Sequence, residues 1–267
     1  MRLSLDRPAR RRSNRMTSSP IFRRIAALQD DLPWGAFLDA GTGRHSLQWV
    51  SALDTKSWTA VTGASGMAGQ VQRAVGPRMR AQDRIVQGNW EDPDLLAGET
   101  YDTVLADYLL GALDGFSPYQ QYRLFHRLRP LVGRRLYVVG LEPYVPYVPQ
   151  DAAGQIVCEI GRVRDACLLL AGERPYREYP LEWVLEQLGQ AGMRILDVHR
   201  FPIRYGKRFI DSQIDMCQMR LPRFAEGAVA SAMQVQLNTL RERALALDTN
   251  LDGLRHGFDY LVAAQPD

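Results

Sequence analysis

Short apolar runs alternate with longer amphipathic ones along most of this 267-residue chain. The short runs predict strands at 36–39, 58–62, 84–87, 103–106, 135–139, 194–198 and 258–263. Apolar residues spaced i, i+3 and i+4 predict helices over 156–170, over 181–191, and over most of 207–249 with a break near Pro222. Strands that alternate with helices are typical of a parallel sheet with crossover helices. We therefore expect a doubly wound α/β fold in a single large domain.

Positive charge is concentrated at the N-terminus. Residues 1–24 hold eight arginines and one acid, which gives this segment +7 and leaves −4 for the rest of a chain whose net charge is +3. We interpret 1–19 as a disordered basic leader, or as the result of a start codon placed upstream of the working start at Met16. An organelle transit peptide and a tether to an anionic surface stay open. The acidic remainder disfavours a nucleic-acid groove, and a cytoplasmic location is expected unless the leader directs import.

No stretch of the sequence has the length and apolarity of a membrane span or a secretory signal. The cysteines are Cys158, Cys167 and Cys217, an odd number without metal-ligand spacing. We expect them to be reduced and buried, and we predict no metal site.

The most informative loop follows the first strand. Residues 38–45 read Leu-Asp-Ala-Gly-Thr-Gly-Arg-His, so an acid and two glycines stand between a strand and a helix. Such glycines let a ligand approach the backbone, although a tight turn alone would also need them. Ser46 stands where a dinucleotide fingerprint has its third glycine, which disfavours a pyrophosphate. An acid before the first glycine suits a ligand that carries an ammonium group.

This loop resembles that of the class I S-adenosylmethionine-dependent methyltransferases, and the resemblance extends over residues 30–264. Asp39, Gly41 and Gly43 match the family's D/E-x-G-x-G-x-G motif, with His45 in place of its third glycine. The resemblance implies that this loop, Thr42 included, holds the methionine end of S-adenosylmethionine. No acid follows the second strand, where the family binds the ribose, so Thr62 or Ser65 is the candidate there.

The third and fourth strands also match the family. The loop Gly88-Asn89-Trp90-Glu91 resembles its adenine site, with Trp90 as the platform and Glu91 or Asp92 as the acid. A core-edge role for Trp90 and a helix cap by Asp92 are the alternatives. Asp107 and Tyr108 end the fourth strand, where the resemblance implies contact with the cofactor and the transferable methyl group.

The resemblance implies a Rossmann-like sheet, mostly parallel with an antiparallel last strand, over residues 20–267. Helical insertions are expected after strands five and six, at about 142–180 and 204–257. The apolar stripe of the second insertion predicts core packing, a face for a homodimer, or a lid.

Candidate acceptor-site residues come from the insertions and strand ends. Glu142 directly follows strand five and His199 ends strand six, so both are candidate catalytic residues. Tyrosines and an arginine are candidates for binding an aromatic or carboxylate-bearing substrate, unless these stretches are only rigid surface loops: Tyr144, Tyr147, Arg177 and Tyr179.

The sequence thus favours methyl transfer from S-adenosylmethionine to a small molecule. Residues 107–110 lack the N/D-P-P-Y/F pattern of enzymes that methylate base or glutamine nitrogens. Two alternatives stay open, namely aminopropyl-type transfer on the same fold and an inactive cofactor-binding scaffold subunit.

Overall fold

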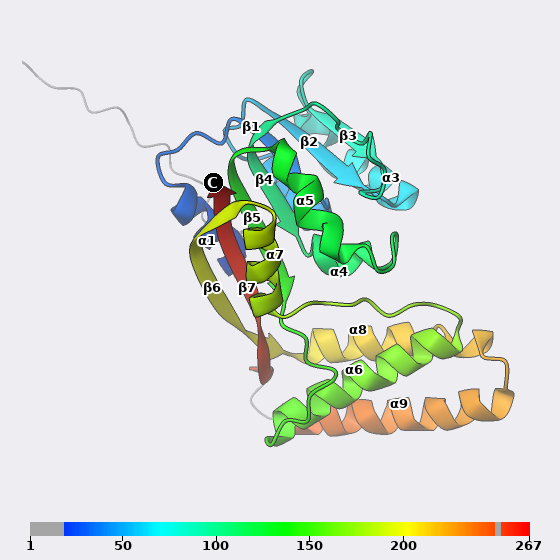
Figure 1. The fold of residues 1–267 in the computed structure, drawn as a ribbon. Coiled ribbons are helices and arrows are strands. Elements are labelled where there is room, and N and C mark those ends of the chain that lie inside the picture. The colour runs from blue at the N-terminus through cyan, green and yellow to red at the C-terminus, as the bar shows by residue number, and fades with distance from the viewer. Residues whose placement is uncertain (1–18, 249–251) are drawn as a thin grey trace, which may run out of the picture.

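The computed structural model describes residues 19–248 and 252–267 and places one seven-stranded sheet at the centre of the molecule (Figure 1). The strands are β1 (Ala36–Asp39), β2 (Ser57–Thr62), β3 (Arg84–Gln87), β4 (Tyr101–Asp107), β5 (Val132–Leu141), β6 (Met193–Tyr205) and β7 (Leu254–Pro266). The α-helices are α1 (Pro20–Gln29), α2 (Arg44–Val50), α3 (Ser65–Val75), α4 (Leu109–Leu113), α5 (Leu124–Leu128), α6 (Ala152–Leu170), α7 (Leu181–Gln190), α8 (Lys207–Gln218) and α9 (Gly227–Leu247). Single 3₁₀ turns lie at Gly76–Arg78, Gln121–Arg123, Arg129–Leu131 and Leu221–Arg223.

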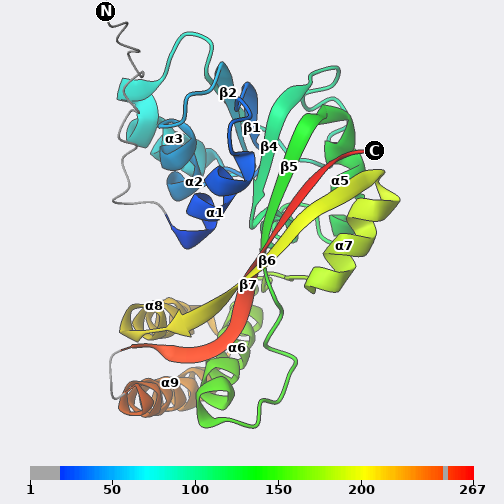
Figure 2. The ribbon, with the colours of Figure 1, turned by 90° about the vertical axis from the view of Figure 1, so that its left-hand side faces the viewer.

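The strand order is β3-β2-β1-β4-β5-β7-β6, with β7 antiparallel to both of its neighbours and the other pairs parallel. Helices α1, α2 and α3 cover one face, and α4, α5 and α7 the other (Figure 2). Each face has its own apolar core, one around Phe37, Leu47 and Trp58 and the other around Leu38, Leu128 and Val184. The predicted doubly wound, mostly parallel sheet is confirmed.

The outer strands are longer than the sequence pattern indicated. The structure extends β6 to Tyr205 and begins β7 at Leu254, and their pairing shifts register between Pro202 and Arg204. The bulge lets the strand continue past Pro202, whose missing N–H breaks a regular ladder. His199 therefore lies inside β6 and not at its end, which corrects the prediction for its place in the strand.

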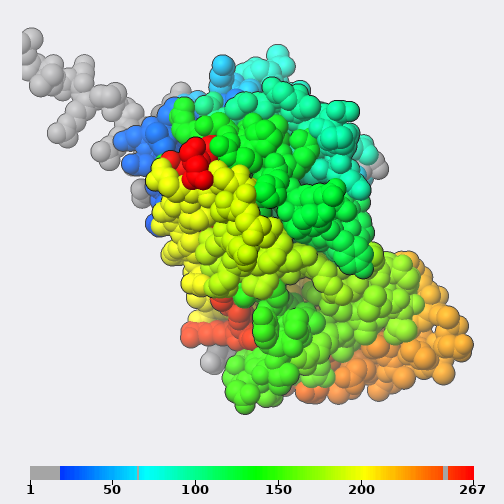
Figure 3. Space-filling model, viewed as in Figure 1, coloured from blue at the N-terminus to red at the C-terminus, as the bar shows by residue number. Residues whose placement is uncertain are grey.

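The extended ends of β6 and β7 lead to a second layer of structure below the sheet. Helices α6, α8 and α9 form a three-helix lobe beyond the carboxyl ends of the parallel strands (Figures 1 and 3). Its separate apolar core includes Ile160, Ile214 and Leu237, all at most 1% exposed. This core explains the apolar stripe that the sequence shows over 207–249.

Helix α6 falls within residues 142–180, and α8 and α9 fall within 204–257. The limits of the domain and of its insertions stay a prediction. Nearly all of the predicted basic leader, 1–18, lies outside the described residues. None of the helices in the described part is both long and apolar enough to cross a membrane.

Candidate functional site

The loop between β1 and α2 is organised around a buried carboxylate. Asp39 is fully buried, and its Oδ2 accepts hydrogen bonds from Thr42 Oγ1 at 2.6 Å and Ser46 Oγ at 2.8 Å. The N–H of Gly43 donates to Ser46 Oγ at 3.0 Å, which fixes the start of α2. Asp39 Oδ1 is buried without a hydrogen-bond partner, although the backbone N–H of Gly41 also interacts with this carboxyl group. Burial raises the pKa of Asp39 from its ordinary 3.8 to about 6.

The two glycines of this loop have different surroundings. A Cβ on Gly41 would lie 2.9 Å from Leu109 of α4, so Gly41 is required for packing. A Cβ on Gly43 would meet no atom within 4 Å, so this glycine borders open space. The open side of Gly43 is where a ligand can approach the backbone. His45, the second residue of α2, is exposed.

The fourth strand brings Asp107 to the same edge. Asp107 pairs with Val139 of β5, and Tyr108 follows it with φ +49°, in the left-handed region that a tyrosine rarely adopts. This conformation turns the chain sharply from β4 into α4, and the Tyr108 hydroxyl donates to Asp259 of β7. Backbone strain of this kind concentrates at functional sites.

The acids at this edge have raised pKa values. Burial, together with the charges of Asp39 and Asp259, raises the pKa of Asp107 from 3.8 to about 7. Burial and the nearby Asp259 raise the pKa of Glu178, which precedes α7, from 4.5 to about 7. Burial raises the pKa of Asp259 as well, against the hydrogen bond from Tyr108. Carboxyls with pKa values near 7 are candidates for proton transfer and for binding cations.

The ends of β2 and β3 are more tightly filled than the sequence suggested. Thr62 Oγ1 accepts a hydrogen bond from the N–H of Ala64 at 3.3 Å, and a Cβ on Gly88 would lie 2.6 Å from Leu95. Trp90 is only 6% exposed, and its Nε1–H donates to the carbonyl of Ala40 at 2.6 Å. These contacts match the alternative in which Trp90 is a core-edge residue.

A different aromatic residue lies at the open edge of this region. The side chain of Phe116 is 45% exposed, and its ring packs against Gly63. A Cβ added to Gly63 would lie 2.8 Å from this ring. Asn89 holds the loop, because its Nδ2 donates to Phe116 O and its Oδ1 accepts from Ser117 Oγ at 2.6 Å. Ser117 also donates to Glu91. Sequence reasoning missed Phe116, whose only signal is an aromatic residue inside the Gly-Phe-Ser-Pro loop.

A cavity of about 1270 Å³ opens between the sheet edge, α1 and α2. Of the predicted residues, it is lined by His45, Asp107 and Tyr108, and it is also lined by Asp259. Glu142 and His199 do not line it. Glu142 instead accepts a hydrogen bond from Leu181 N at 3.0 Å at the start of α7, and His199 is exposed beside Phe201.

The four predicted substrate-binding residues are dispersed. Tyr144 is 5% exposed and hydrogen-bonds with Arg164 of α6, whereas Tyr147 is 54% exposed. Arg177 is exposed and lies 3.8 Å from Asp165, and the half-buried Tyr179 packs its ring 4.1 Å from that of Trp183. The structure therefore brings Tyr144 into a polar cluster with Arg164 but does not bring the four together.

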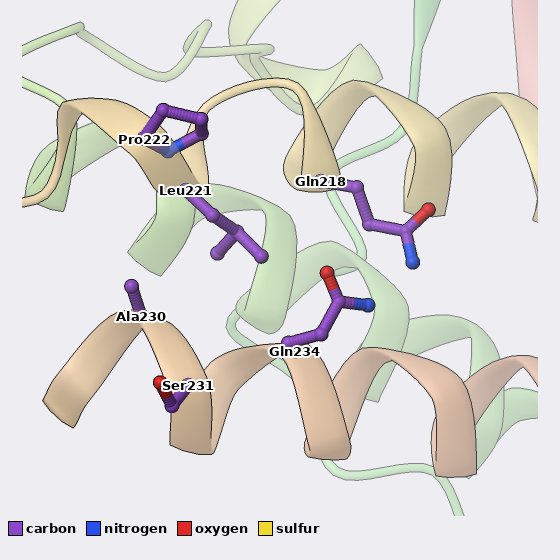
Figure 4. A pocket seen from close by; sticks show the side chains of 6 residues that line it. All are labelled: Gln218, Leu221, Pro222, Ala230, Ser231 and Gln234. Carbon is purple, nitrogen blue, oxygen red and sulfur yellow. The ribbon is translucent and has the colours of Figure 1, made fainter. Parts of the chain in front are cut away.

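A second, smaller hollow of about 460 Å³ lies between α8 and α9 (Figure 4). Its lining consists of Gln218, Leu221, Pro222, Ala230, Ser231 and Gln234, which are uncharged. The hollow is on the three-helix lobe and includes none of the residues at the carboxyl edge of the sheet. Within residues 19–248 and 252–267, no three His, Cys, Asp or Glu side chains are grouped to hold a metal ion.

Comparison with known proteins identifies the fold through structure. No family model and no curated protein sequence matches the chain. A protein from Bacillus halodurans C-125, provisionally assigned as a methyltransferase, superimposes with a TM-score of 0.57 at 14% identity, over 94% of this chain and all of that one. The fold is that of the class I methyltransferases.

Two further solved structures superimpose on the chain with similar scores. The YcgJ protein from Bacillus subtilis gives a TM-score of 0.56 at 15% identity, over 91% of this chain and 97% of that one. Mycolic acid cyclopropane synthase CmaA1, solved with SAH and CTAB, gives a TM-score of 0.52 at 16% identity, over 90% of this chain and 81% of that one. At these identities the likeness extends to the fold and not to a substrate.

Proposed function

We propose that the chain binds S-adenosylmethionine across the carboxyl edge of its sheet and transfers the methyl group to a small acceptor. The observation that carries the proposal is Asp39 Oδ1, a fully buried carboxylate oxygen without a partner. A buried acceptor of this kind costs about 1–3 kcal/mol when unsatisfied. The ammonium group of a methionine moiety beside the open side of Gly43 would satisfy it.

The residues at this edge fit the cofactor in the order expected for the fold. Asp39 and Gly43 would hold the amino-acid end, and Asn89, Glu91 and Phe116 lie past the ends of β2 and β3, where the fold places the purine. The structural neighbour CmaA1 was solved with SAH, which supports a cofactor of this class. Thr62 is engaged by Ala64, so the ribose contact stays a prediction.

When bound, S-adenosylmethionine supplies an electrophilic methyl group on a positively charged sulfur. Asp107, at the end of β4 and on the cavity wall, would accept a proton from the acceptor, since its pKa of about 7 is close to neutral pH. Tyr108 orients Asp259 through its hydroxyl. The three-helix lobe beneath the edge would limit access of water and of macromolecular acceptors (Figure 3).

Methyl transfer to a panel of amine, phenol, thiol and carboxylate acceptors tests this proposal. We expect turnover with one class, and Asp39→Asn should raise the KM for S-adenosylmethionine at least tenfold while Asp31→Asn, an exposed acid outside the site, leaves it unchanged. Absence of turnover with every class would favour the inactive scaffold subunit. Transfer of an aminopropyl group would favour the aminopropyl-transfer alternative.

A further inference from the structure

Three acids from separate parts of the chain lie around the acceptor side of the edge, although within the described residues they are not grouped closely enough to hold a metal ion. Asp107 ends β4 beside Val139, and Asp259 of β7 lies beside Leu141, so these two acids flank the carboxyl end of β5. Glu178 approaches from the segment before α7 and packs on Gly111, where a Cβ would lie 2.1 Å from its Oε1. We refer to Asp107, Glu178 and Asp259 as the acceptor-side acids.

The acceptor-side acids lack a neutralising partner among the described residues. None of the three forms an ion pair within 4.0 Å in that part of the chain. Arg164 of α6 is the nearby cation that interacts with Glu178, but it is already bound to Asp165 at 2.8 Å and to Tyr144. Asp39 of β1 adds further negative charge beside Asp107. The edge therefore holds an excess of buried acid.

Unpartnered polar atoms independently point to a ligand here. Tyr205, at the end of β6, is 5% exposed, and its buried hydroxyl has no hydrogen-bond partner although it interacts electrostatically with Asp259. Glu178 Oε2 is also buried without a partner, although the backbone N–H of Leu141 hydrogen-bonds to this carboxyl group. Buried polar atoms normally find partners, so two of them around one group of acids indicate a missing hydrogen-bond donor.

The cavity beside these acids is amphiphilic. Asp107 and Asp259 form one part of its wall, and Phe22, Trp49 and Phe201 contribute apolar surface elsewhere along it. The arginines that line it, Arg78 and Arg204, are exposed, and Arg204 lies 3.7 Å from Asp252. A ligand with a cationic head and an apolar body matches this distribution, because a cation among buried acids relieves their mutual repulsion.

We propose that the methyl acceptor carries a protonated amine, held by Asp107 and Asp259 on the cavity wall, with Glu178 adding negative charge beside Asp259 and with the apolar body of the acceptor in the cavity. The inference rests on the proposed function, because it assigns these acids to the acceptor and Asp39 to the cofactor. It narrows the four acceptor classes to amines. The bound ammonium group gives a proton to Asp107, and the free amine nitrogen then forms the bond to the methyl carbon as the bond from that carbon to sulfur breaks, which leaves S-adenosylhomocysteine. Tyr108 lies on the same cavity wall, and its hydroxyl donates to Asp259.

Calorimetry on the full chain tests this, with hexylamine, hexanol and hexanoate as probes of equal length, each titrated with and without S-adenosylhomocysteine. We expect hexylamine to bind at least tenfold tighter than hexanol and hexanoate not to bind. Binding at pH 7 should release up to about one proton, seen as a dependence of the heat on buffer ionisation, because the cation lowers the pKa values of Asp107 and Glu178 from about 7.

Variants locate the binding. Asp259→Asn and, separately, Glu178→Gln should each weaken hexylamine at least tenfold and leave S-adenosylhomocysteine binding unchanged, while Glu242→Gln on the exposed side of α9 should change neither. Equal binding of all three probes, preference for hexanoate, or insensitivity to both variants would overturn the inference. Failure to bind S-adenosylhomocysteine with intact, variant-sensitive hexylamine binding would instead contradict the proposed cofactor.

Discussion

Replacement of Asp107 by asparagine is expected to stabilise the protein, and to do so more at high pH. Burial and two nearby acids raise the pKa of Asp107 in the folded chain from 3.8 to about 7. Between these two values the folded state binds more protons than the unfolded state, so stability falls as the pH rises through this range. The penalty is absent below 3.8 and complete above about 7. Asparagine keeps the shape and removes the charge.

The magnitude follows from the width of this window. Each pH unit within it contributes about 1.4 kcal/mol, so the full penalty of a charged Asp107 is about 4 kcal/mol. From pH 5 to pH 8 the stabilisation by Asp107→Asn should grow by about 3 kcal/mol. This figure already includes the repulsion of Asp107 by Asp39 and Asp259.

Urea unfolding at pH 5, 6, 7 and 8, followed by tryptophan fluorescence and circular dichroism, measures the difference in free energy of unfolding. Asp31→Asn serves as the control, because Asp31 is exposed and its variant should show no trend with pH. A constant difference between Asp107→Asn and the unmodified chain, or a loss of stability at pH 8, would refute the reasoning.

Three further predictions concern the cofactor and the lobe. Asp39→Asn should weaken S-adenosylhomocysteine binding by about 10- to 100-fold in calorimetry, since a hydrogen bond to a charged group is worth about 1.5–3 kcal/mol; an unchanged Kd would contradict this. Phe116→Ala should weaken it about 2- to 10-fold at constant Tm, because a stacked ring contributes about 0.5–1.5 kcal/mol and Phe116 is 45% exposed. Leu237→Ala should lower the free energy of unfolding by about 2–5 kcal/mol, because it opens a cavity around a fully buried side chain of α9; a cost below 1 kcal/mol would contradict the packing of the lobe.

Elements with strong local patterns could be predicted from the sequence. The strands at 36–39 and 84–87 have the predicted limits, and the break near Pro222 falls in the 3₁₀ turn between α8 and α9. The β1 loop was recognisable because an acid and glycines there occupy adjacent positions in the chain. The outer ends of β6 and β7 could not be predicted, because apolar and polar residues are mixed there and because β6 contains Pro202.

The acceptor side of the site could not be predicted residue by residue. Glu178 and Asp259 lie 81 positions apart and meet only through the order of β5, β7 and α7. Tyr205 looked like part of a loop, and Phe116 had no periodic neighbours. Glu142 was chosen as the first acid after a strand, but that position also suits a carboxylate that accepts from the first N–H of a following helix.

Calorimetric titration of the full chain with S-adenosylhomocysteine tests the central claim most directly. We predict one site per chain, with a Kd at least tenfold lower than that of Asp39→Asn and with adenosine binding more weakly because it lacks the amino-acid end. Absence of binding to the folded chain, or equal binding of S-adenosylhomocysteine to the Asp39→Asn variant and the unmodified protein, would contradict it.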